Sequence, residues 1–132
     1  MKQGKTLRLT GTEKVAATDG TWAQVTRKGD LVFISGQVGL DEKGELPRTG
    51  GFEAQARLAL DNLVDVLKVA GGTLEDLMMI TVFVTDMANR PTFARVRDGY
   101  FRANPPASTI VEINRLFMDG VLVEINGMAV LD

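Results

Sequence analysis

The chain contains neither cysteine nor histidine in its 132 residues. This absence excludes thiol nucleophiles, cysteine–histidine pairs, serine–histidine–aspartate triads and the usual zinc sites. Any chemistry must therefore use carboxylates, hydroxyls, amides, lysine, arginine, the one tyrosine or a bound water molecule.

Long apolar runs are also missing. No stretch approaches the ~20 apolar residues that a membrane-spanning helix needs, and the N-terminal segment MKQGKTLRLTG lacks the apolar core of a signal peptide. We therefore expect a cytoplasmic protein. The net charge of −2 provides no overall attraction to nucleic acid, so a nucleic-acid partner is not expected.

The composition is typical of a folded domain, with 45% hydrophobic and 24% charged residues. We expect residues 1–132 to form one domain. Alternating and helical patterns of apolar residues predict the element order β-β-β-α-β-α-β-β. The predicted elements cover residues 6–9, 22–27, 30–37, 52–70 (helix), 75–86, 91–103 (helix), 108–113 and 121–131.

Several predicted strands carry apolar residues on both of their faces. The segments LVFIS, MMITVFV and VLVEINGMAVL all have this property, which is typical of strands covered on both sides. Two amphipathic helices cover only one face of such a sheet, so something else must cover the other. Another copy of the chain is the simplest candidate, which predicts a homo-oligomer. A monomer with some exposed aliphatic side chains is the alternative.

Three separated segments resemble the RidA/YjgF family of imine and enamine deaminases. They are LVFISGQVGLDEKGEL at 31–46, GFEAQARLALDNLVDVLKVAGGTLEDLMMITVFVTDM at 51–87 and YFRANPPASTIVEINRLFMDGVLVEINGMAV at 100–130. The resemblance implies an α+β, chorismate-mutase-like fold, in which two helices cover one face of a mixed sheet. It also implies a homotrimer that binds a small molecule in clefts between subunits. In deaminase members, water converts a 2-imino or 2-enamino acid to a 2-keto acid and ammonia, without metal or organic cofactor.

The resemblance assigns the residue that holds the attacking water to Glu124, within VLVEINGMAV. An acid in an apolar strand is costly to bury without a partner, so we expect a raised pKa that helps it carry a proton. The alternative is a solvated, inert acid at a sheet edge or subunit rim. Glu112, in TIVEINR, is the same residue type in a similar strand, and we interpret it as structural.

The resemblance places three further groups around the substrate. Ser35 corresponds to a pocket serine whose hydroxyl is expected to donate to the ligand, and Gly36 lets the backbone approach closely. A Ser-Gly pair that merely ends a strand is the alternative. Trp22 occupies the position of a family tyrosine; it keeps an aromatic wall and an N–H donor but lacks the phenol oxygen.

The largest departure from the family lies in the segment PPASTIVEINRL. Ser108 occupies the position of the arginine that grips the substrate carboxylate, and Ile110 stands where a small or polar residue is common. Losing a bidentate, charge-assisted contact costs a desolvated carboxylate about 2–5 kcal/mol. We expect Ser108 and Glu124 of one copy to face Ser35 and Trp22 of a neighbouring copy.

Other cations are candidates to replace the missing arginine. Arg48 and Arg102 are candidates from a neighbouring copy, whereas Arg115 has the opposite strand parity to Ser108 and is a poor substitute.

Three functions are compatible with these residues. The first is a hydrolase of altered specificity that acts on a small imine, enamine or related metabolite. The second is a non-catalytic trimer that binds a small molecule. The third, RNA binding or cleavage, is least favoured, because the arginines of the second helix are more typical of a solvated surface. These arginines are Arg90, Arg95, Arg97 and Arg102.

Overall fold

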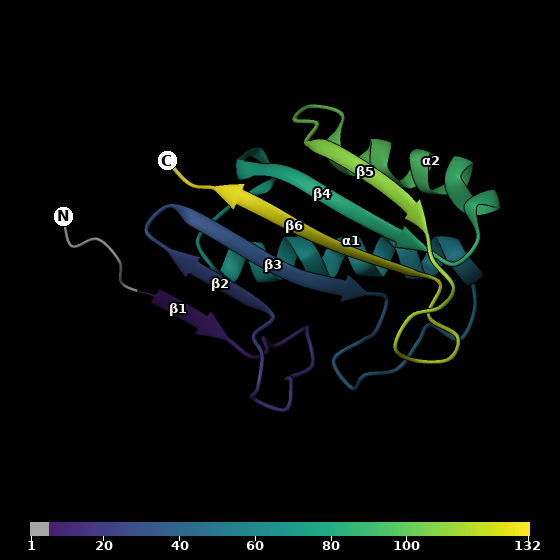
Figure 1. Cartoon of the computed structure of the whole chain (residues 1–132), viewed down its shortest axis with the longest axis horizontal. Coiled ribbons are helices and arrows are strands. Elements are labelled where there is room, and N and C mark those ends of the chain that lie inside the picture. Colours follow the sequence, from purple (N-terminus) through teal and green to yellow (C-terminus); the bar gives the residue numbers. More distant parts are fainter. Residues whose placement is uncertain (1–5) are drawn as a thin grey trace.

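Six strands form one mixed sheet in the order β1-β2-β3-β6-β4-β5, and both helices lie against a single face of it (Figure 1). This computed structural model describes residues 6–132, so the start of the segment MKQGKTLRLTG lies outside the described residues. The strands are β1 Thr6–Leu9, β2 Val25–Lys28, β3 Leu31–Val38, β4 Leu77–Val84, β5 Ala107–Glu112 and β6 Val123–Val130. The helices are α1 Gly51–Val69 and α2 Arg90–Phe101, with short 3-10 helices at Leu74–Asp76 and Met87–Asn89.

The pairing of the strands agrees with the predicted fold class and element order. Neighbouring strands are antiparallel except β4 and β5, which are parallel because α2 carries the chain back between them. The α+β, chorismate-mutase-like prediction of a mixed sheet with two helices on one face is therefore confirmed.

The second predicted strand begins later than the sequence indicated. We expected it from residue 22, but β2 begins at Val25. A turn precedes it, in which Gly20 has a φ of 94° and Asp19 accepts a hydrogen bond from the backbone N–H of Thr21 at 2.8 Å. The Thr18 hydroxyl also donates to the carbonyl of Trp22 at 2.7 Å. Trp22 therefore lies in a turn rather than in the sheet.

The core lies between the helices and the sheet. The predicted apolar stripe of α1 is confirmed, since Ala56, Leu60, Leu63 and Leu67 are all fully buried. These side chains belong to the same cluster as the buried residues of β3, β4 and β6. The burial of these apolar side chains supplies the main favourable free energy of folding.

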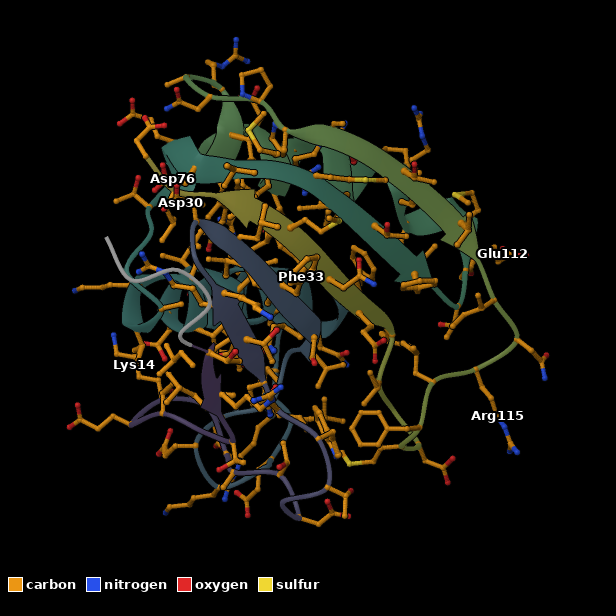
Figure 2. The ribbon with its side chains drawn as sticks, turned by 60° about the vertical axis from the view of Figure 1, so that its left-hand side comes forward. Lys14, Asp30, Phe33, Asp76, Glu112 and Arg115 are labelled. Carbon is orange, nitrogen blue, oxygen red and sulfur yellow. The ribbon has the colours of Figure 1, made fainter. Side chains whose placement is uncertain are left out.

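The opposite face of the sheet carries large apolar side chains that no element covers. They are Leu31, Phe33, Met79, Val111, Met128 and Val130, each between 37% and 48% exposed. Figure 2 labels Phe33 on β3, at the centre of this uncovered face. The prediction of apolar residues on both faces is thus confirmed.

Over residues 6–132, no helix is long and apolar enough to span a membrane.

Candidate functional site

A cavity of about 500 Å³ lies where the C-terminal half of β3 meets the start of β6. Four of the predicted site residues line it: Trp22, Ser35, Gly36 and Glu124. They come from the turn before β2, from β3 and from β6, which are far apart in the sequence. The sheet therefore brings these predicted residues together within one chain.

A β-bulge in β3 shapes the floor of this cavity. Ile34 pairs with Gly127 and Gln37 with Ile125, so Ser35 and Gly36 together oppose the single residue between them on β6. Such a bulge reverses the side-chain alternation that follows it. Gln37 consequently turns into the protein interior, where only 2% of it is exposed.

Gly36 makes room for the side chain of Glu124. A Cβ atom at Gly36 would lie 2.3 Å from Oε2 of Glu124 and 2.4 Å from its Cδ. No side chain fits there while the carboxylate keeps its position. The close approach expected at Gly36 is therefore an approach of the Glu124 carboxylate to the backbone of β3.

Glu124 is a half-buried carboxylate that keeps its acceptor positions free. Among residues 6–132, none forms a hydrogen bond or ion pair with its side chain. Burial raises the pKa of the Glu124 carboxyl above its ordinary value, as expected for an acid without a compensating charge. Such a group can hold a water molecule and exchange a proton with it.

The hydroxyl of Ser35 does not point its proton at the cavity. It donates to the carbonyl of Ala23 at 2.6 Å, while the backbone N–H of Ser35 donates to the carbonyl of Gln24 at 2.9 Å. The expectation that Ser35 donates to a ligand is therefore wrong in this conformation. Its oxygen retains lone pairs and can accept a hydrogen bond from a ligand.

Two buried glutamines support the cavity wall, and sequence reasoning overlooked them. The Gln37 amide donates to Oε1 of Gln24 at 2.8 Å and to the carbonyl of Ser35 at 3.1 Å. Gln24 in turn donates to the carbonyl of Ala16 at 3.1 Å. This chain of bonds ties β3 and the start of β2 to the 15–18 segment. The only signal in the sequence was the position of Gln37 directly after the Ser-Gly pair.

Phe117 is a second aromatic residue of the cavity, and no pattern in the sequence pointed to it. It lies between β5 and β6 and is 72% exposed. Gln55 fixes the end of its segment, because its amide donates to the carbonyl of Gly120 and accepts from the N–H of Leu122, each at 2.8 Å. The cavity therefore has aromatic walls from both Phe117 and Trp22.

Ser108 and Ile110 lie away from this cavity. In β5 they pair with Ile80 and Val82, whose side chains are buried beneath the helices, and parallel partners share a face. The sheet order places β4 between β5 and β6. The expected grouping of Ser108 with Glu124 in one copy is therefore wrong, since Glu124 shares its cavity with Trp22 and Ser35 of its own chain.

No lysine or arginine lines the cavity among the described residues. Arg48 is not part of its wall, and Arg102 donates to Asp98 on α2 at 3.1 Å. Arg115 projects outward from the segment after β5 (Figure 2). Within one chain, none of the three candidate cations supplies the charge that Ser108 lacks.

The arginines of α2 are mostly engaged on the protein surface. Arg95 bonds Glu53 at 2.8 Å, and the guanidinium of Arg97 lies 5.7 Å from the centre of the Phe93 ring. These pairings, with that of Arg102, favour a solvated surface over a nucleic-acid site.

Glu112 has the structural role expected of it, through a bond to the backbone. Its Oε1 accepts the backbone N–H of Met87 at 2.8 Å, which joins the end of β5 to the segment after β4.

Comparisons with known proteins assign the chain to a family. The family described as Endoribonuclease L-PSP matches residues 12–131. A RutC family protein of Sulfurisphaera tokodaii is 36% identical over 111 residues, which cover 84% of this chain and 89% of that protein. The 2-iminobutanoate/2-iminopropanoate deaminase of Mus musculus is 32% identical over 123 residues, covering 93% of this chain and 90% of that protein.

Solved structures agree with this assignment. RidA from Psychrobacter sp. PAMC 21119 superposes with a TM-score of 0.86 at 32% identity, over 95% of this chain and 100% of that chain. TdcF of E. coli with bound serine gives a TM-score of 0.85 at 29% identity, over 96% of this chain and 100% of that chain. With nearly all of its length matched in both sequence and fold, the chain belongs to the RidA/YjgF family, whose other names include L-PSP and RutC.

Proposed function

We propose that this chain is a single-domain, cytoplasmic hydrolase that acts on the C=N bond of a small imine or enamine. The observation that carries the proposal is the half-buried carboxylate of Glu124, which has no partner among residues 6–132 and lines a cavity large enough for a metabolite. The name of the mouse relative supports the reaction class, 2-imino acid deamination. The substrate of this chain is proposed to differ, because Ser108 replaces the carboxylate-binding arginine implied by the family resemblance.

The proposed reaction needs only water and protein groups. Glu124 holds a water molecule, accepts its proton as the oxygen attacks the imine carbon, and passes that proton to the nitrogen. A raised pKa makes the Glu124 carboxylate a stronger base toward this water molecule. Ser35 offers an oxygen that accepts an N–H of the substrate, and Trp22 provides a wall that positions it.

We also propose that three copies assemble through the uncovered face of the sheet. The exposed apolar side chains of β3, β4 and β6 support this, since a face of this kind is rarely left in water. In such a trimer, the edge strand β5 of one copy would bring the exposed Ser108 toward the cavity of the next, whereas Ile110 packs against the core of its own chain. The site would then be complete only between subunits.

The test measures ammonia release from 2-iminobutanoate and 2-iminopropanoate generated in the assay, and from imines without a carboxylate. We expect activity on the second group that Glu124→Gln lowers by about 10²–10⁴-fold, the usual contribution of a general acid–base group. Glu112→Gln is the matched control and should retain full activity, because Glu112 lies outside the cavity.

The alternative is a non-catalytic binding protein of the same fold. Trp22 favours it, because indole replaces the phenol of the family tyrosine and provides neither its acid nor its acceptor oxygen. Binding of a small molecule in the cavity, without ammonia release from any imine above the spontaneous rate, would establish this alternative.

A further inference from the structure

Two large aromatic rings face the cavity without any cover of their own. Trp22 is 50% exposed and Phe117 is 72% exposed, although both line the same hollow. Much of the remaining wall is apolar, including Val15, Ala17 and Leu40. A flat, apolar group placed against these rings would remove aromatic surface from water, and this burial is the usual source of affinity in such sites.

The ionisable groups that line the cavity all carry the same sign of charge. Within the described part of the chain they are Glu124 and Asp41. Backbone N–H groups of Glu45 and Lys43 bond the Asp41 carboxylate and lower its pKa, so it is ionised at neutral pH. A ligand carboxylate would meet the charge of Asp41 and the carboxyl of Glu124, with no lysine or arginine among the described lining residues, whereas a protonated nitrogen would meet two acceptors.

We propose that the cavity selects a cationic ligand: an iminium, or the corresponding amine, that carries a flat apolar group and no carboxylate. Its nitrogen donates a charge-assisted hydrogen bond to Glu124, while its apolar group contacts Trp22 and Phe117. The aromatic faces favour a nearby cation further. Hydrolysis of such a ligand rests on the proposed function. The class of ligand is inferred from the apolar and acidic side chains that line the cavity.

The reaction balances for such a substrate. An iminium R₂C=NH₂⁺ and one water give R₂C=O and NH₄⁺. Glu124 accepts a proton from water as the C–O bond forms, and returns it to the nitrogen of the carbinolamine. The C–N bond then breaks, ammonia leaves with the electron pair, and the proton on the carbonyl oxygen passes through Glu124 to ammonia.

Binding is measured through the fluorescence of Trp22, which is the one tryptophan of the chain. The probes are benzylamine as the cation, benzyl alcohol as the neutral analogue and phenylacetate as the anion. We expect saturable binding of benzylamine, and binding of phenylacetate weaker by at least about tenfold. Glu124→Gln should weaken benzylamine about tenfold and leave benzyl alcohol unchanged, whereas Phe117→Ala should weaken both. Glu112→Gln should leave all affinities unchanged.

Phenylacetate binding as tightly as benzylamine would overturn the proposal, because it would reveal a cation in the assembled site. An unchanged preference in Glu124→Gln would overturn it as well. Turnover is tested separately with benzaldimine, formed in the assay from benzylamine and an amine oxidase, against 2-iminobutanoate. If only 2-iminobutanoate is hydrolysed, the chain is a hydrolase, and the proposed class of cationic ligand without a carboxylate is wrong. If benzylamine binds preferentially but neither imine is hydrolysed, the proposed ligand class is supported and the proposed hydrolase activity is wrong.

Discussion

Replacing Gly36 with alanine should separate the position of the Glu124 carboxylate from the stability of the fold. The new Cβ would lie 2.3 Å from Oε2, 2.4 Å from Cδ and 2.7 Å from Cγ of Glu124, so the whole end of this side chain must move. The backbone at Gly36 is not in the positive-φ region, so alanine meets no backbone strain there. The steric conflict therefore falls on one flexible side chain.

The magnitudes follow from this geometry. Displacing a reacting group by about 1 Å can cost roughly 10²-fold in rate, and we expect a loss of that order in kcat/KM for imine hydrolysis. Stability should change little, because the lower chain entropy of unfolded alanine contributes about 0.4–1 kcal/mol and offsets the cost of moving the carboxylate. In thermal unfolding, this corresponds to a shift in Tm of less than about 4 °C.

The assay combines ammonia release with thermal unfolding for Gly36→Ala, Glu124→Gln and the double variant. Because both substitutions act through the same carboxylate, the double variant should be no slower than Glu124→Gln. Gly99→Ala is the matched control, since a Cβ at Gly99 on α2 would meet nothing within 4 Å beyond its chain neighbours and the backbone of its own helix. Full activity in Gly36→Ala would refute the reasoning, as would rate losses that add in the double variant.

Three further predictions follow from the same site and the uncovered face. Burial raises the pKa of Glu124 above its ordinary 4.5, so the unfolded chain releases this proton at a lower pH than the folded chain does. The wild type should therefore lose stability relative to Glu124→Gln as the pH rises from about 4. Equal differences in Tm between the two proteins at every pH would contradict this. Ser108→Arg should raise activity on 2-iminobutanoate by about 30-fold or more, measured as ammonia release, and no gain would show that the missing cation does not limit the site. Phe33→Glu should convert the proposed trimer to single chains in light scattering with the fold retained in circular dichroism, whereas wild type sedimenting as one chain would remove the trimer.

Local patterns in the sequence were sufficient for most of the fold. The repeat of Ala56, Leu60, Leu63 and Leu67 predicts α1 because a helix brings every third or fourth residue to one face. In β4, apolar residues at every second position predict the buried side chains, because successive side chains of a strand point to opposite faces. The resemblance added Glu124, Ser35 and Gly36, which do line one cavity.

Some residues of the site could not be predicted from the sequence pattern. Phe117 and Asp41 lie in irregular segments, where no period relates a side chain to a face of the sheet. Regular alternation along β3 would turn Gln37 to the uncovered face of the sheet, but the bulge at Ser35 and Gly36 turns it inward. Bulges depend on the partner strand, so the sequence of β3 alone does not reveal them.

By itself, the sequence determined the element order, the chemistry available without histidine or cysteine, and the presence of apolar residues on both faces of the sheet, because these depend on residue type and local spacing. Only the tertiary structure decided which groups meet. The register of β3 against β6 puts the Glu124 carboxylate beside Gly36, and the turn before β2 directs the Ser35 proton to Ala23. These contacts join residues far apart in the chain, so strand register and side-chain direction fix them, and local spacing does not.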